Sequence, residues 1–281
     1  MIPSPGEAPI CLTVDVEEWY HAPEHPLGRD ESAWDALPST LDRTIGASLE
    51  LLDRIGVKGT FFLLGWAAGR FAPGVRAIAE AGHEIACHGW GHRPLDSLDA
   101  QSFREDLRRS RGTIEDASGA KVAGFRAPRW SMGRLTWPYA ILAEEGFAYS
   151  SSRLPIPGLG WGTPGVREVH GVLEIPALRF PAKLFPLPAG GTAALRLLPV
   201  PLLRRARDAA AARGAPAVYW FHPWELLSSA PRLEGGALFR WARYTALDRL
   251  PERIGALVPP GDRRLCDAAR DIAGARRGRA R

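Results

Sequence analysis

The chain has 281 residues, of which 46% are hydrophobic and 24% are charged. These values are typical of a globular protein, so we expect either one large α/β barrel or two smaller domains, and little disorder outside the ends. The formal net charge is +5, and four arginines near the end supply most of it: Arg276, Arg277, Arg279 and Arg281. A basic tail over residues 271–281 is more often a solvated terminus than a nucleic-acid-binding segment, so we expect no nucleic-acid partner.

The cysteines and the first residues bear on location. Cys11, Cys87 and Cys266 are few and widely spaced, which fits a reducing compartment better than a disulfide scaffold. The start of the chain has neither a basic nor an apolar segment of the kind found in signal peptides, and no apolar run is long enough to span a membrane. We expect a cytoplasmic protein without a transmembrane segment; the sequence indicates no particular oligomeric state.

The first predicted strand, over residues 10–16, ends in an acidic run. Side chains alternate along a strand, so Asp15 and Glu17 should face one way and Glu18 the other. Two carboxylates at a strand end suit hydrolysis, in which one binds metal and the other takes a proton. The alternative, an acidic surface turn, is weakened by the apolar strand before it. His21 follows in a loop and could line a cleft, although loop histidines are mostly solvated.

Helices and strands then alternate with short connections. The spacing of apolar residues and the positions of glycine and proline predict helices over residues 41–55, 74–81, 102–117 and 136–146. They predict strands over residues 59–64, 83–87, 122–126 and 147–151. Such alternation indicates parallel strands joined by right-handed crossovers.

His88 and His92 follow the predicted strand over residues 83–87. Two imidazoles four residues apart share one face of a helical turn, and the glycines between them allow the backbone to curl tightly. Because α/β proteins build sites at the carboxyl ends of their strands, we expect a divalent metal here. The spacing alone is only moderately specific, since paired histidines are more often core or surface residues.

The next strand should end near Arg126, because Pro128 cannot continue a central ladder. An arginine at this edge, beside the two carboxylates, would orient one of them. A surface salt bridge is an equally good interpretation of Arg126 taken alone.

Residues 153–200 are rich in proline and glycine. We interpret them as an insertion that shapes a substrate cleft, with candidate strands over residues 165–169 and 172–175. Gly190 and Gly191 could bring backbone N–H groups close to a ligand, although a simple turn is the better interpretation of a glycine pair.

The last part contains one further clear strand, over residues 217–221, which ends at His222 and Pro223. We expect helices over residues 202–213, 236–250 and 251–257, and then the tail.

Six side chains from separate regions thus fall at predicted carboxyl ends of strands: Asp15, Glu17, His88, His92, Arg126 and His222. Their order resembles the polysaccharide deacetylase (NodB-homology, carbohydrate esterase family 4) superfamily, most closely its exopolysaccharide-locus branch. The matching motifs are Thr13-Val-Asp-Val-Glu-Glu-Trp-Tyr-His21, His88-Gly-Trp-Gly-His92, Phe125-Arg-Ala-Pro128, Gly190-Gly191 with Arg196-Leu-Leu-Pro199, and Phe221-His-Pro-Trp-Glu225.

This resemblance implies a distorted (β/α)7 barrel, one domain over residues 1–270, that removes N-acetyl groups from a glycan with one divalent metal, most commonly Zn2+. It implies that Asp15 is the general base, His222 the general acid and Arg126 the residue that positions Asp15. The metal ligands would be Glu17, His88 and His92. For substrate binding we expect Trp130, Trp161, Arg196, Trp224 and Glu225.

The chain departs from the family at Ser150, where the family usually has an aspartate that supports the acid histidine. Two alternatives therefore stay open. The same metal chemistry could act on a small cyclic amide or a nucleotide-linked sugar, which would require a closed pocket rather than an open groove. The chain could also be a catalytically silent, carbohydrate-binding relative.

Overall fold

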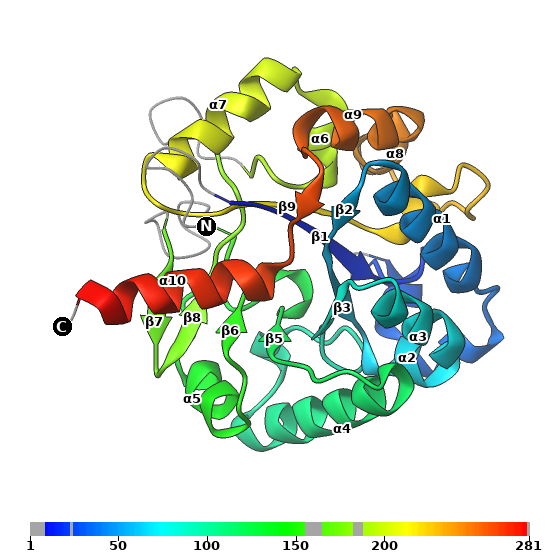
Figure 1. Cartoon of the computed structure of the whole chain (residues 1–281). Helices are drawn as coiled ribbons and strands as arrows, with labels where there is room; N and C mark the ends of the chain where they lie inside the picture. Colours follow the sequence, from blue (N-terminus) through cyan, green and yellow to red (C-terminus); the bar gives the residue numbers. More distant parts are fainter. Residues whose placement is uncertain (1–8, 23–24, 155–164, 182–187, 280–281) are drawn as a thin grey trace.

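The computed structural model describes residues 9–22, 25–154, 165–181 and 188–279. Within these residues, eight strands form one sheet in the order β7-β8-β6-β5-β4-β3-β1-β9, which curls into an open barrel (Figure 1). Of the strands so described, the seven from β8 to β9 are parallel, and β7 is an antiparallel edge strand. The α/β barrel class predicted from the sequence is confirmed.

The strands are short, as expected for a barrel with helices outside it. Their bounds are β1 Ile10–Val16, β3 Thr60–Leu63, β4 Glu84–Cys87, β5 Gly124–Phe125, β6 Tyr149–Ser150, β7 Arg167–Val169, β8 Val172–Glu174 and β9 Ala217–Phe221. β2 Val57–Lys58 and β10 Gly261–Asp262 pair separately.

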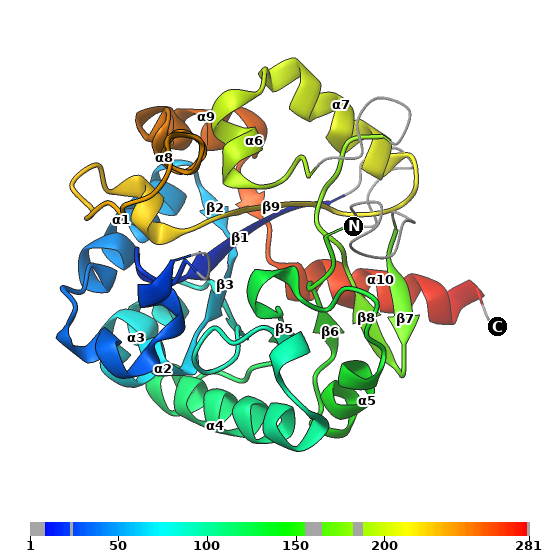
Figure 2. The same cartoon turned by 180° about the vertical axis from the view of Figure 1, so that it is seen from behind.

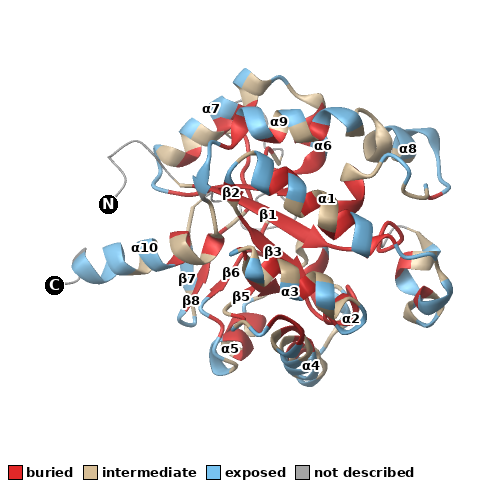
Figure 3. Ribbon diagram, turned by 45° about the vertical axis from the view of Figure 1, so that its right-hand side comes forward, coloured by how far each residue is buried: buried red, intermediate tan, exposed pale blue. Residues whose placement is uncertain are grey.

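Helices cover the outside of the sheet. Their bounds are α1 Leu41–Arg54, α2 Gly65–Arg70, α3 Ala72–Glu80, α4 Ala100–Ser118, α5 Trp137–Glu144, α6 Thr192–Leu197, α7 Val200–Ala211, α8 Ala237–Tyr244 and α9 Leu250–Leu257. Figure 3 shows most of the strands buried, while the edge strand β7 and the outer faces of several helices are exposed. None of the helices in the described ranges has the length and apolar character needed to cross a membrane.

β1 lies between β3 and β9 and is buried along its whole length. It is therefore apolar on both faces, apart from Thr13 and Asp15, which lie two residues apart and point the same way. Thr13 donates a hydrogen bond to the carbonyl of Tyr219 on β9, at 2.9 Å. The strand thus carries its polar side chains into the barrel, toward its carboxyl end.

A tenth helix, α10 Leu265–Arg279, crosses the amino end of the barrel; it lies in front of the strands in Figure 1 and behind them in Figure 2. The Leu265 N–H donates to Thr60 Oγ1 at 2.7 Å, and the Cys266 N–H donates to Glu84 Oε2 at 2.9 Å. These contacts cap the first turn of α10 and its apolar side packs on the strands, so the chain stays helical where the sequence predicted a solvated tail.

The segment after β8 belongs to the barrel wall. Leu178 N–H donates to the carbonyl of Val218 at 3.4 Å, and Trp220 N–H donates to that of Gly190 at 2.9 Å. A Cβ on Gly190 would lie 2.1 Å from the Val218 oxygen, so this glycine permits close packing on β9 and not approach to a ligand. Parts of the predicted insertion, residues 155–164 and 182–187, lie outside the described residues.

Candidate metal and catalytic centre

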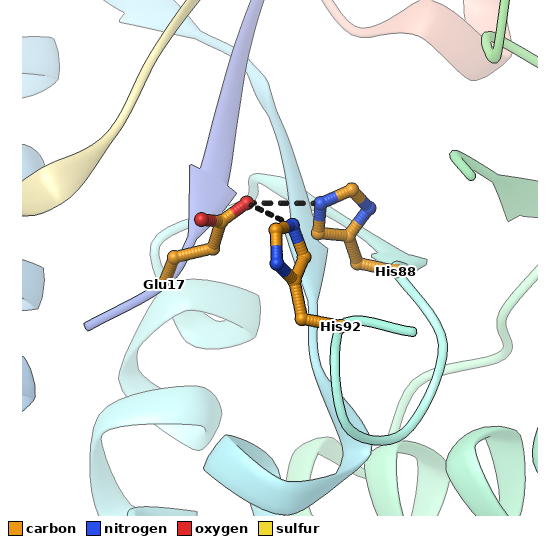
Figure 4. A group of neighbouring side chains, drawn as sticks. All are labelled: Glu17, His88 and His92. Atoms are coloured by element: carbon orange, nitrogen blue, oxygen red, sulfur yellow. Dashed lines mark hydrogen bonds and ion pairs between the residues drawn. The ribbon is translucent and has the colours of Figure 1, made fainter. Parts of the chain in front are cut away.

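Glu17, His88 and His92 converge at the carboxyl end of the barrel (Figure 4). Glu17 Oε1 lies 3.1 Å from His88 Nε2 and 3.0 Å from His92 Nε2, and all three residues are buried. Ligands about 2.0 Å from a tetrahedral zinc ion are about 3.3 Å apart, so this spacing fits one ion. Two imidazoles and one carboxylate also leave further coordination positions for water and substrate.

His88 and His92 meet through a loop and not through the helical turn predicted from their spacing. Gly89 has φ 78° and His92 has φ 56°, which turns the backbone back toward β4. Gly91 is needed for another reason, because a Cβ there would lie 2.5 Å from Glu31 Oε2. The glycines of the motif thus act as expected, by allowing a tight backbone path, although the path itself is different.

A backbone carbonyl fixes the orientation of the His88 ring. Its Nδ1 lies 2.8 Å from the carbonyl oxygen of Arg126, which accepts a hydrogen bond from the Nδ1–H group. This contact leaves Nε2 directed at Glu17. Burial disfavours the charged form of Glu17, but the nearby His92 and hydrogen bonds from both histidines outweigh it and hold the pKa of Glu17 well below its usual range. Glu17 is therefore a carboxylate, the form that binds a cation.

Asp15 and Arg126 form a buried ion pair, with Arg126 Nη1 2.5 Å from Asp15 Oδ1. The guanidinium also donates to Thr13 Oγ1 at 2.9 Å and to the Ser151 carbonyl at 3.0 Å. With its other donors fixed, Arg126 holds one carboxylate oxygen of Asp15. Glu18 faces the opposite way and accepts from Thr40, as side-chain alternation predicted.

His222 follows β9 and is paired with Glu225. Its Nδ1 lies 3.1 Å from Glu225 Oε2, and its backbone N–H donates to the same oxygen at 2.9 Å. Burial disfavours a charged imidazole, but the hydrogen bond to Glu225 and the negative charges of Glu17, Glu225 and Asp15 raise the pKa of His222 to about 9. The imidazole is thus protonated near neutral pH, which a general acid requires.

The structure corrects the prediction that Arg196 and Glu225 bind substrate. Both are buried, and within the described ranges neither lines the cavity at the site. Arg196 donates to the carbonyls of Ala242 and Thr245 and lies 3.7 Å from Glu225 Oε1. Glu225 therefore contacts His222 directly, and Arg196 lies next to Glu225.

His222 has an acidic partner although residue 150 is a serine. The Ser150 hydroxyl donates to Ser152 Oγ at 2.7 Å, inside the barrel. Glu225, three residues after His222, supplies the carboxylate that the sequence suggested was missing.

A cavity of about 330 Å³, here called the central cavity, opens over these groups. Its lining residues are Asp15, Glu17, His21, Ala22, His88, His92, Arg129, Trp130, Trp220, His222, Trp224 and Arg243. Trp130 and Trp224, two of the predicted sugar-binding residues, are among them. The third, Trp161, lies outside the described residues.

Sequence reasoning gave His21 only as a residue that could line a cleft, and it missed Arg129 and Arg243. His21 is fully buried, not solvated, and its Nδ1 accepts the backbone N–H of Glu18 at 3.2 Å. Arg129 follows the Arg126 motif directly and could have been found from that position. Arg243, by contrast, reaches the cavity from α8 and donates to the carbonyl of Trp19 at 2.9 Å, a long-range contact without a local sequence signal.

Comparisons with known proteins match two segments of the chain. The family profile for polysaccharide deacetylase matches residues 32–145, and that for a domain of unknown function, DUF3473, matches residues 160–268. A peptidoglycan deacetylase-like protein from Gibberella zeae is 34% identical over 110 residues, covering 38% of this chain and 32% of that protein. A peptidoglycan deacetylase from Helicobacter pylori is 29% identical over 104 residues, covering 37% and 35%. The matched segments span about a third of these relatives.

Solved structures share the fold. A protein from Mycobacterium smegmatis assigned to the polysaccharide deacetylases superposes with a TM-score of 0.64 at 24% identity, over 96% of this chain and 92% of that one. A family 4 carbohydrate esterase (CE4) pseudoenzyme from Bacillus anthracis superposes with a TM-score of 0.50 at 16% identity, over 94% and 66%. These likenesses establish a common architecture.

The chain thus contains a segment, residues 32–145, that matches the polysaccharide deacetylase family, as its motifs predicted. Its assignment to the exopolysaccharide-locus branch stays a prediction.

Proposed function

We propose that this protein is a metal-dependent hydrolase that removes N-acetyl groups from the amino sugars of a glycan. The observation that carries the proposal is the arrangement of Asp15, the Glu17–His88–His92 triad and His222 around one cavity. A base, a cation site and an acid around one cavity are the groups that hydrolysis of an amide bond requires.

Glu17, His88 and His92 would hold the divalent metal, and we propose Zn2+ because two imidazoles and one carboxylate are common zinc ligands. When bound, the metal supplies Lewis-acid activation of water and of the acetamide carbonyl. In the free protein, the short contacts from Glu17 to both imidazoles keep the three donor atoms close together.

Asp15 acts as the general base. The second oxygen of its carboxylate can take a proton from water while Arg126 holds Oδ1. As that proton moves to Asp15, the water oxygen bonds to the acetyl carbon. Arg126 is a positioning residue in this scheme, because its guanidinium touches Asp15 and not the substrate.

His222 acts as the general acid. Cleavage of the carbon–nitrogen bond leaves a strongly basic amine, so the departing nitrogen needs a proton. His222 donates this proton, and Glu225 stabilises the protonated imidazole beforehand. The products are acetate and the free amino sugar.

The surroundings of the site favour a glycan chain over a small molecule. Trp130, Trp220 and Trp224 give the central cavity aromatic walls of the kind that stack on sugar rings. Two further cavities adjoin it and share lining residues with it, so the depression continues past the metal triad. A cyclic amide or a nucleotide-linked sugar would need only the central cavity.

Acetate release from N-acetylated oligosaccharides tests this function. Purified protein is freed of metal, reloaded with zinc and incubated with tetrasaccharides and with small acetamides. We expect zinc-dependent release of acetate from the oligosaccharides. Tight oligosaccharide binding without acetate release from any substrate would instead identify a catalytically silent, sugar-binding relative.

A further inference from the structure

Three cavities in the described part of the chain meet at Arg129. The first is the central cavity. The second, of about 470 Å³ and here called the Arg134 cavity, is lined by Pro94, Asp96, Arg129, Trp130, Ser131, Gly133, Arg134, Leu135 and Leu154. The third, of about 350 Å³ and here called the Arg93 cavity, is lined by Gly28, Arg29, Glu31, Trp34, Gly91, His92, Arg93, Pro94, Ser97 and Arg129. Arg129 is thus placed where a chain passing the metal triad would extend to either side.

The backbone holds Arg129 outward. Arg129 has φ 57° and Trp130 has φ 56°, two successive left-handed residues that are not glycine. Such conformations cost free energy and persist where the surroundings impose them. Here the indole of Trp130 packs against Trp220, with ring centroids 4.7 Å apart, and under the guanidinium of Arg126 at 4.4 Å. With Trp130 fixed inside, the Arg129 side chain is exposed at the mouth of the site.

The two flanking cavities are basic. The described residues that line them include four arginines and two acids: Arg29, Arg93, Arg129, Arg134, Glu31 and Asp96. One of the acids, Glu31, already accepts the indole N–H of Trp90 at 2.8 Å. Within the described ranges, Arg129 and Arg134 have no carboxylate within ion-pair distance.

The acids of the central cavity do not cancel this charge. Asp15 is paired with Arg126, and Glu17 lies between His88 and His92. Arg129, which lines all three cavities, therefore keeps its charge available to a ligand. An arginine fork matches the two oxygens of a carboxylate or a phosphate, which suits it to recognise an anionic group.

We propose that Arg129 binds a carboxylate or phosphate carried by the glycan, and so selects an anionic N-acetylated substrate over a neutral one. The inference rests on the proposed function for the ligand being a glycan. The preference itself follows from the position of Arg129 at the junction of the cavities. The anionic group would lie on or next to the acetylated sugar.

Calorimetric binding to metal-free protein tests the inference without turnover. The probes are a hyaluronan tetrasaccharide, which carries carboxylates, and a neutral chitin tetrasaccharide; N-acetylglucosamine 1-phosphate and N-acetylglucosamine form the phosphate pair. We expect the wild type to bind the charged member of at least one pair about five- to tenfold more tightly, between the effects of an exposed ion pair and a buried charged hydrogen bond. The pair that shows the preference identifies the anionic group.

Substitutions at residue 129 isolate the side chain, because alanine, lysine and glutamate all bear the same backbone cost at φ 57°. We expect Arg129→Ala to remove most of the preference, Arg129→Lys to keep part of it and Arg129→Glu to reverse it. The control is Arg205→Ala, which removes an exposed charge from α7 outside the three cavities and should keep the wild-type preference.

Equal affinity of the wild type for charged and neutral probes would overturn the inference, as would a preference that survives Arg129→Ala. Failure to bind any probe would overturn it as well. Failure of the proposed function is distinguishable, because it would show as absent acetate release in zinc-loaded protein while the charge preference in metal-free protein persisted.

Discussion

His222 Nδ1 and its own backbone N–H converge on one oxygen of Glu225, at 3.1 Å and 2.9 Å. This arrangement fixes the imidazole by two contacts to a carboxylate only three residues away in sequence. Glu225 is itself buried, and Arg196 lies on its other side. A buried carboxylate that keeps its charge favours a protonated His222.

Glu225→Gln should shift the pH dependence of deacetylation. The raised pKa of His222, about 9, means that the acid stays protonated at neutral pH and is lost as pH rises through that value. Without the Glu225 charge the pKa should fall toward its usual value near 6.5, so the basic limb of the kcat profile should move to lower pH. Bound metal lowers the pKa of His222 in both proteins. The variant and the wild type are therefore compared with the same amount of bound metal.

The matched control for this shift is Glu252→Gln, which removes a carboxylate on α9 that does not contact His222 in the described structure. Its profile should coincide with that of the wild type. An unmoved basic limb in Glu225→Gln would separate Glu225 from the acid.

His222→Ala should lower kcat by about 10²–10⁴-fold, because the amine would leave without a proton donor. KM should change much less, since the aromatic walls of the cavity remain. Steady-state kinetics with an N-acetylated oligosaccharide measures both quantities, and circular dichroism checks the fold. Full activity in this variant would remove His222 from the mechanism.

Ser150→Asp, which restores the acid usual in the family, should not raise activity here. Ser150 is buried and lies in register with Glu174 of β8, whose pKa is raised by burial. A second carboxylate beside Glu174 should lower the free energy of unfolding by about 2–4 kcal/mol. Denaturant unfolding measures this loss, with Ser150→Ala as the milder control; a stable and more active Ser150→Asp protein would contradict the assignment of that role to Glu225.

Gly190→Ala should destabilise the barrel wall, because its Cβ would clash with the Val218 carbonyl of β9. We expect a loss of about 2 kcal/mol or more in the free energy of unfolding. Gly112→Ala is the control: nothing lies within 4 Å of a Cβ there, and alanine inside α4 should stabilise by up to about 1 kcal/mol. Equal unfolding midpoints for the two variants would show that the wall tolerates a side chain at Gly190.

The alternation of elements could be predicted from the sequence because strands such as β1, β3 and β4 are short, largely apolar runs bounded by helix signals. The hairpin β7–β8 was predicted as two strands, but its pairing with β6 was not, since register across the sheet depends on distant residues. α10 was missed because its contacts, Leu265 to Thr60 and Cys266 to Glu84, join residues about two hundred positions apart.

The same division holds for the site. Asp15, Glu17, His88 and His92 were accessible to sequence reasoning because each lies at or after the carboxyl end of a recognisable strand. The contact between Glu225 and His222 was not recognised. From the sequence alone, a carboxylate three residues after a histidine could equally well bind substrate. Arg243 could not be placed at all, since α8 reaches the cavity only through tertiary packing. The predicted cytoplasmic location stays a prediction.

The central claim is that Glu17, His88 and His92 hold the ion required for deacetylation. It is tested most directly by titrating zinc into metal-free protein while measuring bound metal and acetate release in the same sample. We expect one zinc per chain, acetate release in proportion to bound zinc, and neither in His88→Ala. Equal acetate release from metal-free wild type, or from His88→Ala, would contradict the account.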